Sequence, residues 1–114
     1  MLMQFNEYDQ IHKIYVTENG AAFQDKIVDE KIDDKDRLDF LKSCINEVNR
    51  ARKSSEKIKG YFVWSFTDNF EWAEGFVPGF GIVHVDFTTQ KRIIKASGRW
   101  YSTFINKSIP EINE

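Results

Sequence analysis

The apolar run KIKGYFVWSF, residues 57–66, constrains the fold of this chain more than any other stretch. It is nearly continuous rather than alternating, and aromatic and β-branched residues dominate it. Such a run is typical of a strand covered on both faces, as in a parallel sheet. Parallel strands are joined by a crossover, usually a helix. We therefore expect a second strand and a connecting helix.

Both elements are visible upstream of the run. Residues 13–17, KIYVT, have the composition of a short strand. A helix is predicted to begin at Asp33 or Asp34, either of which offers an N-cap, and to end near Arg52. Its apolar residues recur at helical spacing, namely Leu38, Leu41, Ile45 and Val48.

The rest of the chain continues the alternation. Residues 21–33 are polar and are expected to be irregular, whereas GIVHVDF, residues 81–87, predicts another short strand. A last helix is expected over about 95–105. This order of strands and helices predicts an α/β fold of parallel strands with crossover helices, in one domain.

Two unusual segments directly follow predicted strands. Glu18 stands in TENG after the first strand, and TDNFEWAEGF, residues 67–76, follows the second. Carboxylates are rarely buried without a partner, so Glu18 either caps a turn or does chemistry. In parallel α/β folds, the chemistry gathers at the carboxyl ends of the strands. This position favours a functional role for Glu18.

The second segment has the composition of a sugar-binding site. Aromatic rings stack on the C–H face of a pyranose, and carboxylates accept hydrogen bonds from its hydroxyl groups. The alternative is that the rings are core residues and that Asp68 and Asn69 form a turn. The residues concerned are Trp64, Asp68, Phe70, Glu71, Trp72, Glu74 and Phe76.

Together these motifs resemble the C-terminal part of a family 1 glycoside hydrolase, the β-glucosidase group. The resemblance covers about residues 13–101 and is carried by YVTENG, GYFVWSFTDNFEWAEGF and FGIVHVDFTTQKRIIKASGRWY. It implies a (β/α)₈ TIM barrel that hydrolyses β-glucosides with retention, without a cofactor. Residues 1–114 would then be a single C-terminal piece of the barrel domain.

The resemblance also implies roles for individual residues. Glu18 corresponds to the catalytic nucleophile. Glu71 would bind two hydroxyl groups of the glycone, with Trp72 beside it. Trp64 would form the floor on which the glycone stacks, and Phe80 would close part of the pocket. Asp68, Asn69 and Glu74 are expected to support the site rather than to touch the sugar.

One catalytic group of the family is not found in this sequence. The NEP motif, which supplies the acid/base, is absent, and Glu7 does not replace it because Tyr8 stands where the motif has proline. The expected partners are therefore a β-glucoside and the N-terminal part of the barrel. Open sheet edges also favour self-association.

Composition excludes several other classes of function. The net charge of −2 and the pI of about 5.7 give no electrostatic footprint for nucleic acid. His12 and His84 lack neighbours at metal-ligand spacing, so no metal is expected. The single Cys44, the absence of a signal-peptide pattern and the lack of an apolar span predict a cytoplasmic protein without membrane contact.

Two functional hypotheses stay open beside that of an enzyme part. The chain could be a carbohydrate-binding or interaction module that keeps the Trp64–Glu71–Trp72 surface without catalysis. It could also be a catalytically inactive truncated remnant.

Overall fold

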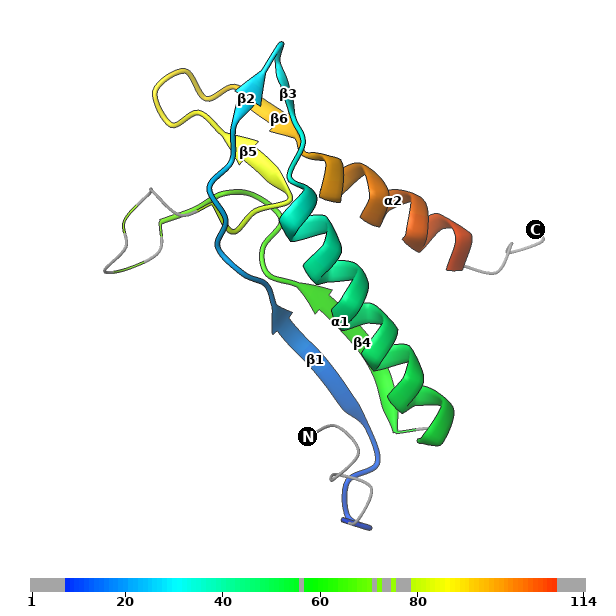
Figure 1. Cartoon of the computed structure of the whole chain (residues 1–114). Helices are drawn as coiled ribbons and strands as arrows, with labels where there is room; N and C mark the ends of the chain where they lie inside the picture. The colour runs from blue at the N-terminus through cyan, green and yellow to red at the C-terminus, as the bar shows by residue number, and fades with distance from the viewer. Residues whose placement is uncertain (1–7, 56, 71, 73–74, 76–78, 109–114) are drawn as a thin grey trace, which may run out of the picture.

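The computed structural model describes residues 8–55, 57–70, 72, 75 and 79–108. It contains two helices and six strands (Figure 1). In chain order these elements are β1 (Ile14–Asn19), β2 (Ile27–Val28), β3 (Lys31–Ile32), α1 (Lys35–Ser54), β4 (Ile58–Val63), β5 (Val83–Val85), β6 (Arg92–Ile94) and α2 (Ala96–Ser108).

The strands β1 and β4 form a parallel pair, and α1 is the crossover between them (Figure 1). Ile14 pairs with Ile58, after which the register shifts so that Tyr15 pairs with Gly60. The predicted strand at residues 13–17, the helix and the parallel pairing are all confirmed. This unit fixes the direction of both strands, so that their carboxyl ends lie at the same edge of the sheet.

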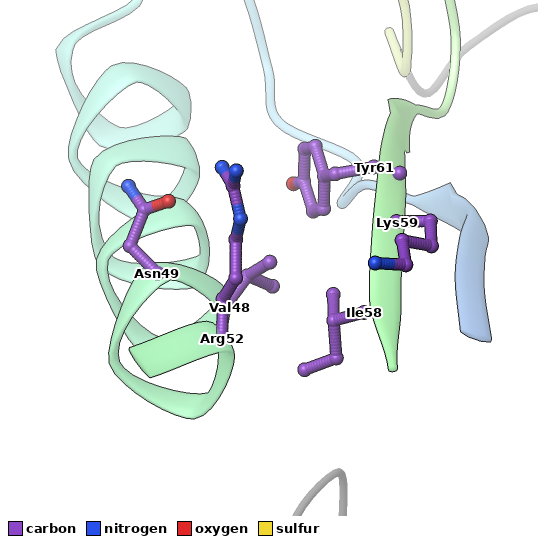
Figure 2. A pocket seen from close by; sticks show the side chains of 7 residues that line it. Val48, Asn49, Arg52, Ile58, Lys59 and Tyr61 are labelled. Carbon is purple, nitrogen blue, oxygen red and sulfur yellow. The ribbon is translucent and has the colours of Figure 1, made fainter. Parts of the chain in front are cut away.

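Helix α1 covers one face of this pair. Leu41 and Ile45 are buried on α1, and Val48 of α1 faces Ile58 of β4 (Figure 2). On the uncovered side, Tyr15 of β1 is 51% exposed and Phe62 of β4 is 56% exposed.

The expectation that β4 is covered on both faces is therefore wrong for the part of the chain that the structure describes. The ring of Tyr15 passes within 2.7 Å of the point where a Cβ on Gly60 would lie, so only glycine leaves room for that ring. In a (β/α)₈ barrel this inner face is filled by side chains from the other strands. The apolar run has the composition of such a face, although none of the described residues covers it.

Two short antiparallel hairpins complete the fold. The pair β2–β3 lies within residues 21–33, which were expected to be irregular, and β5 pairs with β6 rather than standing as a single strand. The turn between β5 and β6 is held by Asp86, whose carboxylate accepts hydrogen bonds from the backbone N–H groups of Thr88 and Thr89. A hydrogen bond with the Thr89 side chain, together with these backbone hydrogen bonds, holds the pKa of Asp86 below its usual value.

The core lies where the second hairpin and both helices meet. Leu41 of α1 packs with Ile82 and Val83, and four half-buried residues surround them, namely Phe40, Val63, Trp100 and Tyr101. Helix α2 approaches closely at Gly98, where an added Cβ would lie 2.6 Å from the carbonyl oxygen of Ile82. Among the described residues, no helix is long and apolar enough to cross a membrane.

Gly98→Ala is expected to destabilise the chain although alanine favours helices. Alanine gains about 1 kcal/mol of helix propensity over glycine. The clash with the Ile82 carbonyl is expected to outweigh this gain, because overpacking typically costs about 1–3 kcal/mol. Urea denaturation followed by circular dichroism measures the difference. Ser102→Ala, at an exposed position of the same helix, is the control and should be neutral or stabilising.

Candidate active site

Glu18 is the next-to-last residue of β1, and its side chain is exposed. The backbone N–H of Trp64, directly after β4, donates to the carbonyl of Asn19 at 2.9 Å. This hydrogen bond extends the parallel pairing to the carboxyl ends of both strands. The segment that contains Glu18 therefore lies beside the segment that contains Trp64. A Cβ on Gly20 would lie 1.6 Å from the Trp64 carbonyl oxygen, so only glycine fits there. The peptide bond between Trp64 and Ser65 is cis.

An open hollow of about 710 Å³ lies at this edge of the sheet. Its lining residues are Glu18, Trp64, Asn69, Phe70 and Trp72. The residues Trp64 and Trp72 are 39% and 84% exposed, so aromatic surface is available beside the Glu18 carboxylate. The structure thus brings together three of the predicted site residues, and it adds Asn69 and Phe70 to them.

Of the described site residues, Phe80 does not line this hollow. Glu71 and Glu74 lie outside the described residues. Phe80 is half-buried, and its carbonyl accepts a hydrogen bond from the N–H of Ser65 at 3.3 Å. Its role in closing the pocket stays a prediction.

Hydrogen bonds between residues close in sequence hold the loop that follows β4. The amide of Asn69 donates to the hydroxyl oxygen of Ser65 at 2.9 Å and to the carbonyl of Thr67 at 3.2 Å. On the other side, the hydroxyl of Tyr61 donates to Oδ1 of Asn19 at 2.6 Å. Burial raises the pKa of Tyr61, so this hydroxyl group keeps its proton and acts as a donor.

Behind the loop lies a network of buried charges that the sequence did not reveal. The ammonium of Lys95, which is fully buried, lies 2.5 Å from Asp25 and 2.8 Å from Asp68. The guanidinium of Arg37 lies 2.8 Å from Asp25 and 2.6 Å from Asp34. Burial opposes the charge of Arg37, but the hydrogen bonds to Asp25 and Asp34 outweigh it and leave its pKa raised.

The buried charges hold the backbone around Phe80. Asp68 accepts a hydrogen bond from the N–H of Gly81 at 2.9 Å and lies 3.1 Å from Nδ1 of His84. Arg37 donates to the carbonyl of Gly79 at 2.5 Å. The supporting role of Asp68 stays a prediction, and these contacts are the physical reason for it.

Asp34 caps a different helix from the one expected. It stands at the N-cap position of α1, but its side chain makes no capping hydrogen bond there. The carboxylate instead accepts hydrogen bonds from the backbone N–H and the hydroxyl of Ser97, in the first turn of α2. Asp34 is thus the N-cap residue of α1 by position, as predicted, but the expected capping hydrogen bond is absent because Ser97 and Arg37 occupy the carboxylate.

A sequence signal for Arg37 did exist. Arg37, Leu41 and Ile45 recur every four residues and so share the buried face of α1. A charged residue on such a stripe needs a buried partner, although the stripe does not say which. Within the described ranges, no three His, Cys, Asp or Glu side chains are arranged to hold a metal ion.

A second hollow lies at the opposite, amino end of β4 (Figure 2). It is lined by Val48, Asn49 and Arg52 of α1 and by Ile58, Lys59, Gly60 and Tyr61 of β4. None of the described residues that were predicted for the site lines it. The Glu18 hollow is therefore the candidate active site.

Comparison with known proteins decides the family. The sequence model of glycosyl hydrolase family 1 matches residues 1–109. A 1,4-beta-D-glucan glucohydrolase from Thermotoga neapolitana is 54% identical over 97 residues, which are 84% of this chain and 22% of that protein. The chain belongs to glycosyl hydrolase family 1.

Two other family 1 relatives add to this picture. The solved family 1 β-glucosidase from Thermotoga maritima matches with a TM-score of 0.90 and 46% identity, over 96% of this chain and 25% of that chain. A 6-phospho-beta-galactosidase from Clostridium acetobutylicum is 42% identical over 96 residues, which are 84% of this chain and 20% of that protein. The chain thus spans about a fifth to a quarter of the length of these relatives, and its fold is a partial family 1 TIM barrel.

Lys95→Met is expected to destabilise this family 1 chain by roughly 3–5 kcal/mol, because it removes the buried cation of Asp68 and leaves Asp25 with Arg37 alone. The matched control is Lys91→Met, which breaks the exposed ion pair with Glu30. Solvent screens an exposed pair, so its loss should change the free energy of unfolding far less. Equal urea midpoints for the two variants would show that the buried network contributes no more than a surface pair.

Proposed function

We propose that this chain forms the C-terminal part of a retaining β-glucosidase-like hydrolase and supplies its nucleophile, Glu18. The observation that carries the proposal is the shared hollow at the carboxyl ends of β1 and β4. There the Glu18 carboxylate lies beside the exposed rings of Trp64 and Trp72. A carboxylate next to aromatic surface provides both a nucleophile and a stacking platform for a sugar ring.

The reaction would proceed in two steps. A carboxylate oxygen of Glu18 bonds to the anomeric carbon while the bond from that carbon to the leaving oxygen breaks, and a general acid donates a proton to that oxygen. Water then attacks the anomeric carbon of the glycosyl ester and gives a proton to the group that served as the general acid in the first step. The bond from the anomeric carbon to Glu18 breaks, which releases the carboxylate. Two displacements at one carbon retain its configuration.

The position of Glu18 suits the first step. The carboxyl end of a strand is a rigid mount, and β1 is held there by the Trp64–Asn19 and Tyr61–Asn19 hydrogen bonds. Within the proposal, Trp64 stacks on the glycone, Trp72 lies beside it, Glu71 accepts hydrogen bonds from its hydroxyl groups, and Phe80 closes the pocket.

The acid/base must come from another part of the barrel. In retaining enzymes the two carboxyl groups lie about 5–5.5 Å apart across the scissile bond. Asp68, the described carboxylate of the loop after β4, is buried and bonded to Lys95 and Gly81. The proposed partner is therefore the N-terminal part of a family 1 barrel.

The isolated chain is expected to have no measurable glycosidase activity, because general acid catalysis contributes about 10²–10⁴-fold and positioning by the other strands contributes more. Hydrolysis of 4-nitrophenyl β-glucoside by the purified chain tests this.

A fusion that joins the six preceding βα units of the Thermotoga maritima β-glucosidase to this chain, called here the completed barrel, should be active. Glu18→Gln should lower its rate by at least 10³-fold, and an active Glu18→Gln fusion would refute the proposed nucleophile.

We also expect the completed barrel to prefer non-phosphorylated glucosides. A carboxylate at Glu71 repels a phosphate and accepts hydrogen bonds from neutral hydroxyl groups, and residues 76–80 contain no Lys or Arg. The ratio of kcat/KM for 4-nitrophenyl β-glucoside to that for its 6-phosphate should exceed about 10. Glu71→Ser should lower this ratio, because it removes the carboxylate that repels the phosphate. Faster hydrolysis of the phosphorylated substrate would contradict this prediction and would favour a substrate like that named for the 6-phospho-beta-galactosidase relative.

Sugar binding without catalysis is a second candidate function, favoured by the exposure of Trp72 and Trp64. Stacked sugars would quench or shift tryptophan fluorescence in the isolated chain. Trp72→Ala should then abolish the change, whereas Glu18→Gln should leave it in place.

A further inference from the structure

The pairing of β1 with β4 is irregular at the position of Glu18. Val16 of β1 pairs with Tyr61 of β4, and the next pair is Asn19 with Val63. Between these two pairs β1 advances by one residue more than β4 does, and Glu18 lies inside this shift. Such a bulge interrupts the ladder of hydrogen bonds and re-aims a side chain. The regular ladder therefore does not by itself fix the direction of the Glu18 side chain.

The burial pattern of β1 shows the same break. Half-buried and exposed residues alternate from Ile14 onward, as expected of a strand with one covered face. The alternation fails at Thr17 and Glu18, which are both exposed, and a half-buried residue follows at Asn19. The strand thus recovers its contact with the rest of the fold at the residue directly after Glu18.

Asn19 is held through both its main chain and its side chain. Its carbonyl accepts the hydrogen bond from the N–H of Trp64 at 2.9 Å, and its Oδ1 accepts the hydrogen bond from the hydroxyl group of Tyr61 at 2.6 Å. Burial raises the pKa of the Cys44 thiol on α1, and a hydrogen bond with the Asn19 side chain opposes that rise. The Asn19 side chain is therefore directed toward α1.

Tyr61 lies on the same side of the strand pair as α1. Figure 2 shows its ring on the side of β4 that faces the helix. The hollow beside Glu18 is lined by residues of the strand ends and of the loop after β4, and neither Tyr61 nor any residue of α1 is among them. Tyr61 thus does not reach a sugar bound beside Glu18. It can act on the reaction only through the backbone that it holds.

We propose that Tyr61 is a positioning residue for the nucleophile. Its hydroxyl group holds the Asn19 side chain and so fixes the bulged end of β1, with the Glu18 carboxylate facing the hollow. Without that donor, the half-buried Asn19 oxygen loses its partner, which favours a shift of the strand end toward water. A displacement of about 1 Å at a reacting group can cost about 10²-fold in rate. This proposal deepens the proposed function and rests on it for the role of Glu18.

Hydrogen exchange of the isolated chain, followed by NMR, tests whether Tyr61 holds β1. Tyr61→Phe removes only the hydroxyl group. The amide of Trp64 should then exchange at least about tenfold faster, because the Asn19 carbonyl that protects it is held less firmly. The amide of Ile14, bonded to the carbonyl of Lys57 at 2.8 Å near the other end of the pair, is the internal control and should keep its rate.

Tyr101→Phe is the matched control variant. Tyr101 is also a half-buried tyrosine packed against the core, and among the described residues its hydroxyl group makes no hydrogen bond to β1. It should leave the exchange of the Trp64 amide unchanged. Equal exchange of this amide in both variants would overturn the proposal. Faster exchange of the Ile14 amide as well would show a general loss of stability and would also contradict it.

A double-mutant cycle in the completed barrel tests the effect on the reaction. Tyr61→Phe should lower kcat for 4-nitrophenyl β-glucoside by about 10- to 100-fold and change KM by less than about threefold, because the aromatic surface of the hollow is untouched. Asn19→Ala should lower kcat as well. The double variant should be no slower than Asn19→Ala alone, since both residues act through one hydrogen bond. Independent effects that multiply in the double variant would refute action through Asn19.

Failure of the positioning role is distinguishable from failure of the proposed function. An inactive Glu18→Gln barrel beside a fully active Tyr61→Phe barrel would overturn the positioning role and leave Glu18 as the nucleophile. A Glu18→Gln barrel that stays active would contradict the proposed function. In that case the exchange rate of the Trp64 amide still decides whether Tyr61 holds the end of β1.

Discussion

The buried ammonium of Lys95 is the contact on which the arrangement of this chain depends. The ammonium joins Asp25, from the loop after β1, to Asp68, from the loop after β4. Lys95 itself directly precedes α2. Arg37 of α1 completes the link through Asp25 and Asp34. Such a network adds little net stability over an apolar core, but each charge fixes the position of the others because an unpaired buried charge costs several kcal/mol.

The network explains how loops without regular structure can support a site. The strands β1 and β4 place Glu18 and Trp64 at one edge of the sheet, and their hydrogen bonds need no help from the loops. The chain from Ser65 to Gly81 then returns to the core, where Asp68 holds the N–H of Gly81. The backbone around the hollow is thus bound at both ends, while the aromatic rings that line it stay exposed.

The sequence predicted the elements whose patterns are local and missed those that depend on distant partners. The period of α1 and the composition of β1 and β4 led to the parallel pair and to the shared edge of Glu18 and Trp64. The strand β5 was predicted within residues 81–87, but the hairpin β2–β3 and the strand β6 were missed because strands of two or three residues carry too little pattern. The bond from Ser97 to Asp34 spans 63 positions, and no local pattern encodes it. The prediction that both faces of β4 are covered was wrong because the apolar composition of β4 suits a complete barrel, in which other strands cover the inner face.

The most direct test of this account is to trap the glycosyl ester in the completed barrel. A 2-deoxy-2-fluoro glucoside with a good leaving group slows hydrolysis of the ester more than its formation, because fluorine destabilises the positive charge of the transition state. Digestion and mass spectrometry then locate the label. The account predicts a single fluoroglucosyl adduct on the peptide that contains Glu18, absent from Glu18→Gln. An adduct on another carboxylate of an active enzyme would contradict it.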